Sequence, residues 1–227
     1  MGEGRRVGEI AVSFVPREQV AEAVKKAIEY SPKRRFKQSI EMIIILKDID
    51  PRSPEGRIRE TIFLPKGVKK DIKICVVADG DTVIKAREAG AHKVITRAEL
   101  QTIDKKSAKK IAQECDWVLV RTDLMAQAGR ILGPALGPRG KIPVPVPPSA
   151  DIVSVMNRYK RAVLIRTKDQ PQIMCRIGTE DMNINDVVEN AYAVLSALET
   201  KLRSPRQNIA KIIIKTTMGP PIEVLWR

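Results

Sequence analysis

Apolar and polar residues alternate along the chain with two different periods, and each period predicts one class of element. Apolar residues recur every three or four positions in residues 16–30 and, most clearly, in residues 185–202, which predicts two amphipathic helices. Alternating or β-branched runs predict strands, and a short helix is expected at residues 152–159. The predicted strands are residues 39–46, 57–64, 162–167, 172–177 and 209–217.

The middle of the chain follows a different pattern, in which short apolar strands alternate with helices. Strands are predicted at residues 72–78, 93–96 and 117–121, and each is followed by a helical segment. Such alternation is typical of a parallel, Rossmann-like sheet. The predicted fold class is therefore α/β in the middle and α+β in the two flanking segments.

Two arrangements of these three blocks are possible: three small units, or a middle domain inserted into one domain that both flanks build together. Each flank alone has too few strands for a covered core, which favours pairing. We therefore predict a discontinuous α+β domain, residues 1–66 plus 149–227, and an inserted Rossmann-like domain, residues 67–148.

Charge indicates the class of partner. The chain has 227 residues with 41 Lys and Arg against 27 Asp and Glu, a formal net charge of +14. A basic surface gains affinity for nucleic acid by releasing counterions, and anionic membrane is the rival partner. Because no apolar run approaches about 20 residues and no secretion signal precedes the first helix, we predict a cytoplasmic protein without a membrane span.

Few residues offer chemistry beyond binding. Cys75, Cys115 and Cys175 are far apart and flanked by apolar residues, so we expect buried free thiols. With His92 as the one histidine, neither a zinc site nor a catalytic base of ordinary spacing can be assembled. Four glycines between positions 129 and 140 match neither the dinucleotide fingerprint nor the phosphate loop. We predict no enzyme, no metal and no cofactor, with a nucleotide-binding enzyme and a general polyanion binder as the alternatives.

Two motifs suggest a specific RNA site. Lys33, Arg34 and Arg35 stand beside Phe36, which combines phosphate attraction with a stacking surface. An isoleucine-rich strand near the other end continues into Thr216-Thr217-Met218-Gly219-Pro220. These residues, the helix at 185–202, the segment 59–65 and the turn 136–140 together resemble the ribosomal protein L-one family, in its archaeal form.

The resemblance implies a two-domain protein whose inserted domain moves about hinges, placed here at residues 66–67 and at Ser149. Family members bind large-subunit rRNA, forming the stalk beside the exit site from which deacylated tRNA leaves. They also bind a mimic of that RNA in the leader of their own mRNA, which represses translation. We accordingly expect rRNA, the mRNA leader and, transiently, exit-site tRNA as partners of a protein that is monomeric when free.

The resemblance also implies the site residues. The family's RNA face falls on Phe36, Ser39, Thr217, Met218 and Gly219, and four cations complete the predicted RNA-binding set: Lys37, Arg59, Arg166 and Lys215. At Lys37-Gln38 and at Lys141-Ile142-Pro143 the chain departs from the usual bacterial pattern.

Overall fold

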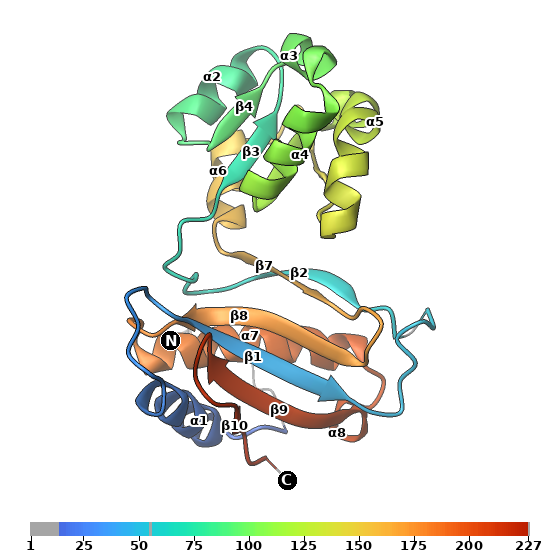
Figure 1. The fold of residues 1–227 in the computed structure, drawn as a ribbon. Helices are drawn as coiled ribbons and strands as arrows, with labels where there is room; N and C mark the ends of the chain where they lie inside the picture. Colours follow the sequence, from blue (N-terminus) through green and yellow to red (C-terminus); the bar gives the residue numbers. More distant parts are fainter. Residues whose placement is uncertain (1–13, 55, 227) are drawn as a thin grey trace, which may run out of the picture. The chain divides into compact units, whose positions relative to one another are not determined.

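The computed structural model describes residues 14–54 and 56–226, which form two compact units (Figure 1). The flanking unit comprises the chain up to Lys70 and from Arg161 onward, and the inserted unit comprises Asp71–Lys160. Antiparallel sheets occur in the first and a parallel sheet in the second, so the predicted mixed fold class is confirmed.

The flanking unit is built on a four-stranded antiparallel sheet of order β10-β9-β1-β8. A two-stranded ladder, β2-β7, continues beside β8. Helices α1 and α7 pack against one face of the larger sheet and against each other. The elements are α1 (Arg17–Glu29), β1 (Ser39–Leu46), β2 (Arg59–Phe63), β7 (Ala162–Arg166), β8 (Gln172–Thr179), α7 (Ile184–Lys201), α8 (Pro205–Asn208), β9 (Ile209–Thr216) and β10 (Ile222–Glu223).

The core of the flanking unit follows from strand alternation. On β1 the side chains alternate strictly between buried and half-buried, and Ile40, Met42 and Ile44 are fully enclosed against the helices. Helix α7, the clearest sequence prediction, begins at the side chain of Asn183, which accepts a hydrogen bond from the Asn185 N–H. The opposite face of the sheet keeps Met174 exposed.

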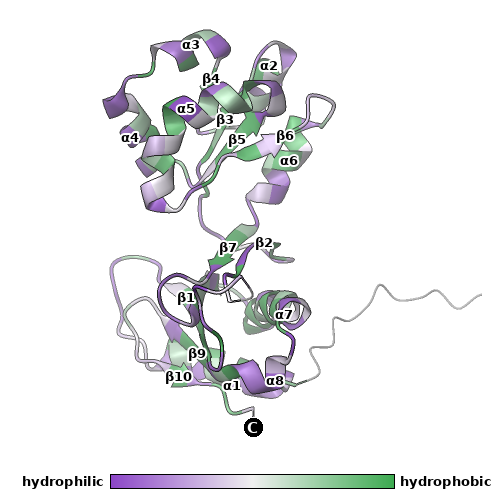
Figure 2. Ribbon diagram, turned by 90° about the vertical axis from the view of Figure 1, so that its right-hand side faces the viewer, coloured by the Kyte–Doolittle hydropathy of each residue, from purple (hydrophilic) through white to green (hydrophobic). Residues whose placement is uncertain are grey.

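The inserted unit has a parallel sheet of order β4-β3-β5-β6 with helices on both faces. One core cluster joins the sheet to α3, α4 and α5, and the other joins it to α2 and α6. Figure 2 shows β3 and β5 as hydrophobic, as expected for strands covered on both sides. The elements are β3 (Ile74–Val77), α2 (Asp81–Glu88), β4 (Lys93–Ile95), α3 (Arg97–Thr102), α4 (Lys105–Glu114), β5 (Trp117–Arg121), η1 (Thr122–Leu124), α5 (Met125–Leu136), η2 (Gly137–Arg139), β6 (Val144–Val146) and α6 (Ile152–Tyr159).

The division between the units differs from the one drawn from the sequence. It falls after Lys70 and after Lys160, whereas the predicted boundaries followed residues 66 and 148. Helix α6 accounts for the larger difference, because its buried Ile152 and Met156 pack in the core of the inserted unit. The predicted junction at Ser149 is thereby replaced by one between Lys160 and Arg161.

The expectation of three free thiols was wrong. Cys75 on β3 and Cys115 at the end of α4 form a disulfide, with their Cα atoms 5.7 Å apart. The backbone brings them together, since the Asp116 and Trp117 N–H groups both donate to the Lys73 carbonyl. Cys175, on β8 in the flanking unit, is free and buried, and this burial raises the pKa of its thiol to about 12.

Two further properties concern only the part of the chain described here. No helix in it combines the length and the apolar character that crossing a membrane requires. Nor does it place three or more His, Cys, Asp or Glu side chains together as ligands for a metal ion.

Candidate nucleic-acid interface

The candidate site lies where the first strand begins and the last long strand ends. The Thr217 N–H donates to the Ser39 carbonyl over 3.0 Å, and the Ser39 N–H donates to the Thr217 hydroxyl over 3.1 Å. These bonds continue the β1-β9 ladder by one pair beyond β9. Segments about 180 residues apart in sequence therefore meet at one end of the sheet.

Gln38 organises this end of the sheet from within. Its side chain is 1% exposed, and its amide donates to the Ser31 hydroxyl over 2.8 Å and to the Pro32 carbonyl over 2.9 Å. The amide oxygen accepts from the Met218 N–H over 3.0 Å. One buried side chain thus connects the loop before β1 to the segment after β9.

A second polar contact restricts the residue type at position 219. The fully buried Thr216 hydroxyl lies 2.7 Å from the Ser31 hydroxyl. A Cβ added at Gly219 would stand 2.3 Å from that Thr216 oxygen, far inside contact distance. Glycine is needed here so that the chain can turn back over Thr216, where the Gly219 N–H donates to the Thr216 carbonyl.

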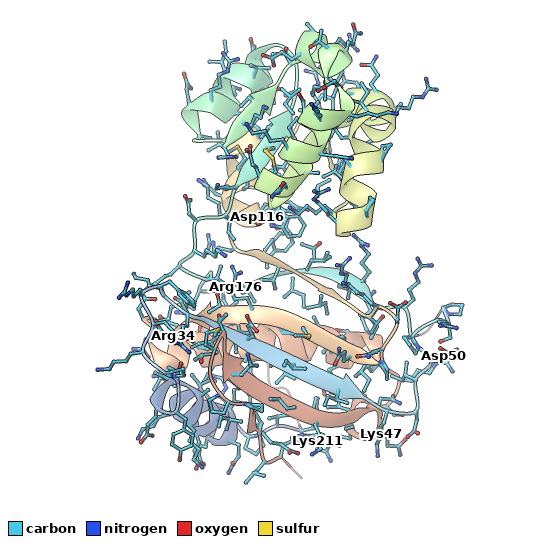
Figure 3. All side chains as sticks on the ribbon, viewed as in Figure 1. Arg34, Lys47, Asp50, Asp116, Arg176 and Lys211 are labelled. Atoms are coloured by element: carbon cyan, nitrogen blue, oxygen red, sulfur yellow. A yellow bond between two sulfur atoms is a disulfide. The ribbon has the colours of Figure 1, made fainter. Side chains whose placement is uncertain are left out.

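Large apolar side chains are exposed beside this network. Phe36 and Met218 are each 51% exposed, although both types are usually buried. Lys33, Arg34 and Arg35 precede Phe36 and are also exposed. Figure 3 places Arg34 at the end of the flanking unit opposite Lys47 and Asp50. An exposed ring beside cations suits a nucleic acid, whose bases stack and whose phosphates attract charge.

We call Phe36, Gln38, Ser39, Thr217, Met218 and Gly219 the sheet-end cluster. Lys215 lies at its border, where its ammonium donates to the Thr217 carbonyl over 3.0 Å. The cluster brings together all five residues that the family resemblance placed on the RNA face. Gln38, which also belongs to this cluster, was not in the RNA-binding set predicted from the sequence.

Lys37, which was predicted to contact RNA, forms an ion pair within the protein. Its ammonium lies 2.8 Å from an Asp181 carboxylate oxygen, whose partner oxygen accepts from the Thr179 hydroxyl over 2.6 Å. The hydrogen bond from Lys37, followed by the one from Thr179, lowers the pKa of Asp181 to about 2. The hydrogen bond to Asp181 and its negative charge raise the pKa of Lys37. Lys37 therefore joins the loop to the end of β8.

This ion pair predicts a pH dependence. The native pKa of Asp181 lies below its ordinary value of 3.8, so the pair stabilises the fold above about pH 4, and this contribution is lost as the pH falls through about 2. Carboxyl-detected NMR titration should find Asp181 among the most acidic groups. In Lys37→Gln its pKa should move up towards 3.8, and a wild-type Asp181 that already titrates near 3.8 would contradict the pairing.

Arg59 and Arg166 are not part of the sheet-end cluster. They lie directly opposite each other on β2 and β7. Arg166 is the last residue of β7, and the chain then turns into β8. The first residue of β8, Gln172, pairs with Ile45 near the far end of β1. The structure thus divides the predicted residue set between two ends of the same unit.

The inserted unit was the alternative place for a functional site. A cavity of about 430 Å³ does lie at the carboxyl ends of its parallel strands, where α/β proteins bind ligands. Its lining combines the carboxylates Asp79, Asp81 and Asp151 with the cations Lys85 and Arg121, so it offers phosphate no excess of positive charge. His92 lies 3.9 Å from the Glu114 carboxylate, outside this cavity. Neither feature supports a nucleotide-dependent enzyme.

A hydrogen-bonded cluster that exposes stacking and hydrogen-bonding groups at a sheet end is typical of a binding protein. Comparison with known proteins then specifies the class. Residues 18–220 match the model of the Ribosomal protein L1p/L10e family, and the chain belongs to that family. Because this family is structural and non-enzymatic, the chain is not an enzyme.

Three relatives show how close the match is. The chain is 73% identical to the large ribosomal subunit protein uL1 of Staphylothermus marinus, over 92% of this chain and 97% of that protein. It is 59% identical to the protein of the same name from Hyperthermus butylicus, over 95% and 100%. Identity to the Aeropyrum pernix protein is 54%, over 90% and 94%. The predicted resemblance to the archaeal form of the family is confirmed.

Proposed function

We propose that this protein is a constituent of the large ribosomal subunit in the cytoplasm and binds large-subunit rRNA through the sheet-end cluster. The observation that carries the proposal is the set of hydrogen bonds made by Gln38 and Ser39, which joins Thr217 and Met218 to the start of β1 beside the exposed Phe36. Its relatives, each named as a large ribosomal subunit protein, support the proposal.

The chemistry of the cluster suits folded RNA. Thr217 presents a hydroxyl that can meet a 2′-hydroxyl or a phosphate, and Gly219 lets the two backbones approach closely. Phe36 and Met218 offer apolar surfaces to a base or a ribose. Contacts to shape and to the 2′-hydroxyl are how proteins distinguish RNA from DNA.

The family resemblance extends this proposal to three further roles. The rRNA complex forms the mobile stalk beside the exit site, and the bound protein assists release of deacylated tRNA. A leader segment of its own mRNA that mimics the rRNA would occupy the same cluster, which makes the protein a repressor of its own translation. The free protein acts as a monomer in this scheme.

The first measurement is binding of the purified protein to the stalk fragment of large-subunit rRNA, with excess unrelated structured RNA as competitor. We expect affinity in the nanomolar range that survives the competitor. Binding that the competitor abolishes would instead identify a general polyanion binder, whose affinity follows charge alone and falls steeply with salt.

Thr217→Val should weaken binding to the same fragment by about 1–3 kcal/mol, because valine leaves polar RNA atoms unpaired at the contact. Filter binding gives the affinity, and thermal unfolding checks that the fold is retained. Thr200→Val is the matched control, since Thr200 is exposed on α7 and bonds only within that helix. Equal affinities for the two variants would remove Thr217 from the site.

A further inference from the structure

A groove on the inserted unit lies between α4 and α5, which pack side by side (Figure 1). Its volume is about 270 Å³. The half-buried Ile103 and Ile131 and the buried Ala108 and Ala135 line it, and all four belong to or pack against the core cluster of this face of the sheet. Among the described residues that line the groove, none is aromatic. The groove therefore has an aliphatic floor.

Exposed cations border the groove on both helices. Lys105 and Lys109 lie on α4 and Arg130 on α5. Side chains four positions apart share one face of a helix, so the two lysines repel each other. In the part of the chain that the structure describes, no ion pair involves these three cations, whereas Lys110 on the same helix lies 3.9 Å from Glu114. The positive charge at the groove is thus available to a partner.

One carboxylate lines the groove, and it is engaged at the start of α4. Asp104 accepts a hydrogen bond from the Ser107 N–H over 2.9 Å and thereby caps the helix. Its negative charge is stabilised by the positive end of the helix dipole. The groove consequently combines an aliphatic floor with a border that carries more positive than negative charge.

This combination suits one class of occupant. Amphipathic helices bind in hydrophobic grooves by placing apolar side chains, spaced three or four positions apart, on the floor. Acidic residues beside that apolar stripe complement the cations at the border. A nucleic acid would use the cations but not the floor, because its bases bind by stacking on flat side chains, above all aromatic rings.

We propose that the α4-α5 groove binds an acidic amphipathic helix of a partner protein. Apolar side chains of that helix contact Ile103 and Ile131, and its carboxylates pair with Lys105, Lys109 and Arg130. The small size of the groove makes the complex weak and exchangeable. This interaction is separate from the RNA binding proposed for the flanking unit and does not depend on it.

The test is a titration of the full-length protein with a fluorescent synthetic peptide that forms a helix with leucines on one face and glutamates beside them. We expect a dissociation constant in the micromolar range, with backbone amide NMR shifts concentrated in α4 and α5. A peptide of the same composition in scrambled order is the control and should bind at least tenfold more weakly. Equal affinity for both peptides, or no binding of the ordered one at millimolar concentration, would refute the proposal.

A double variant locates the site. Lys105→Glu plus Arg130→Glu should weaken binding of the acidic peptide at least tenfold, and should strengthen binding of a peptide with lysine in place of each glutamate. Lys93→Glu plus Lys106→Glu is the matched control, since Lys93 and Lys106 are exposed in the same unit but do not line the groove. It carries the same change in net charge, so an equal loss in both variants would overturn the assignment to this groove.

A third variant separates contact with the floor from charge attraction. Ile131→Gln should weaken binding of the acidic peptide at least fivefold, because it replaces half-buried apolar surface by an amide, and thermal unfolding checks that the inserted unit remains folded. Unchanged affinity in this variant would refute docking on the floor. If deacylated tRNA shifts the amide signals of Ile103 and Ile131 while the peptide does not, the occupant is RNA and the proposed protein partner is excluded.

Discussion

Replacing Cys75 with serine should lower the free energy of unfolding of the inserted unit by about 4 kcal/mol. The disulfide to Cys115 spans a sequence separation of 40 residues. Closing a loop of that size lowers the conformational entropy of the unfolded chain, which corresponds to a free energy of about 4 kcal/mol at 25 °C. Calorimetry on the oxidised full-length protein should show the transition of the inserted unit at a markedly lower temperature in the variant.

The third cysteine provides the control. Cys175→Ser should respond to reducing agent as the wild type does, since Cys175 lies in the flanking unit and forms no disulfide. Cys75→Ser should be insensitive to reductant. Thiol titration of the denatured, unreduced wild type should find one free thiol, and three would refute the bond. Disulfides do occur in intracellular proteins of hyperthermophiles.

Replacing Gln38 with leucine should lower the free energy of unfolding of the flanking unit by about 2–6 kcal/mol. Leucine fills a similar volume but leaves the Met218 N–H and the Pro32 carbonyl without their partner, and each unpaired buried group costs about 1–3 kcal/mol. Denaturant unfolding gives this value. Affinity for the rRNA fragment should fall more than tenfold under conditions where the variant remains folded.

Gln207→Leu is the matched substitution, because Gln207 is exposed on α8 of the same unit. It should change stability by less than about 0.5 kcal/mol. Amide exchange at Met218 adds a local readout, since its N–H should lose protection in Gln38→Leu and keep it in Gln207→Leu. Wild-type stability in Gln38→Leu would show that the network does not hold the cluster together.

Strand periodicity could have identified Gln38 from the sequence. The buried positions 40, 42, 44 and 46 of β1 continue backwards to position 38 with the same period of two. Of the two residues at which the chain departs from the bacterial pattern, Lys37 and Gln38, the predicted RNA-binding set included only Lys37. The sequence pattern was sufficient to place Gln38 inside, but its partners at Ser31, Pro32 and Met218 depend on how the chain ends meet.

Other features could not be predicted from one sequence. The Lys37 to Asp181 pair joins residues 144 positions apart, and no local period connects them. The same is true of the Cys75 to Cys115 bond, whose partners are adjacent only because β3 and β5 pair in the parallel sheet. Helix α6 was predicted at the right residues, yet its apolar face does not reveal which sheet it covers.

Strand β9 occupies a central position in its sheet, between β10 and β1. During synthesis β1 emerges well before β9, and until β9 follows, one side of β1 lacks its hydrogen-bonding partner and the sheet-end cluster lacks Thr217, Met218 and Gly219. The cluster is therefore assembled only after residues 209–219 have been translated. If the cluster binds RNA as proposed, nascent chains that end before this segment do not compete for the same RNA with chains that contain it.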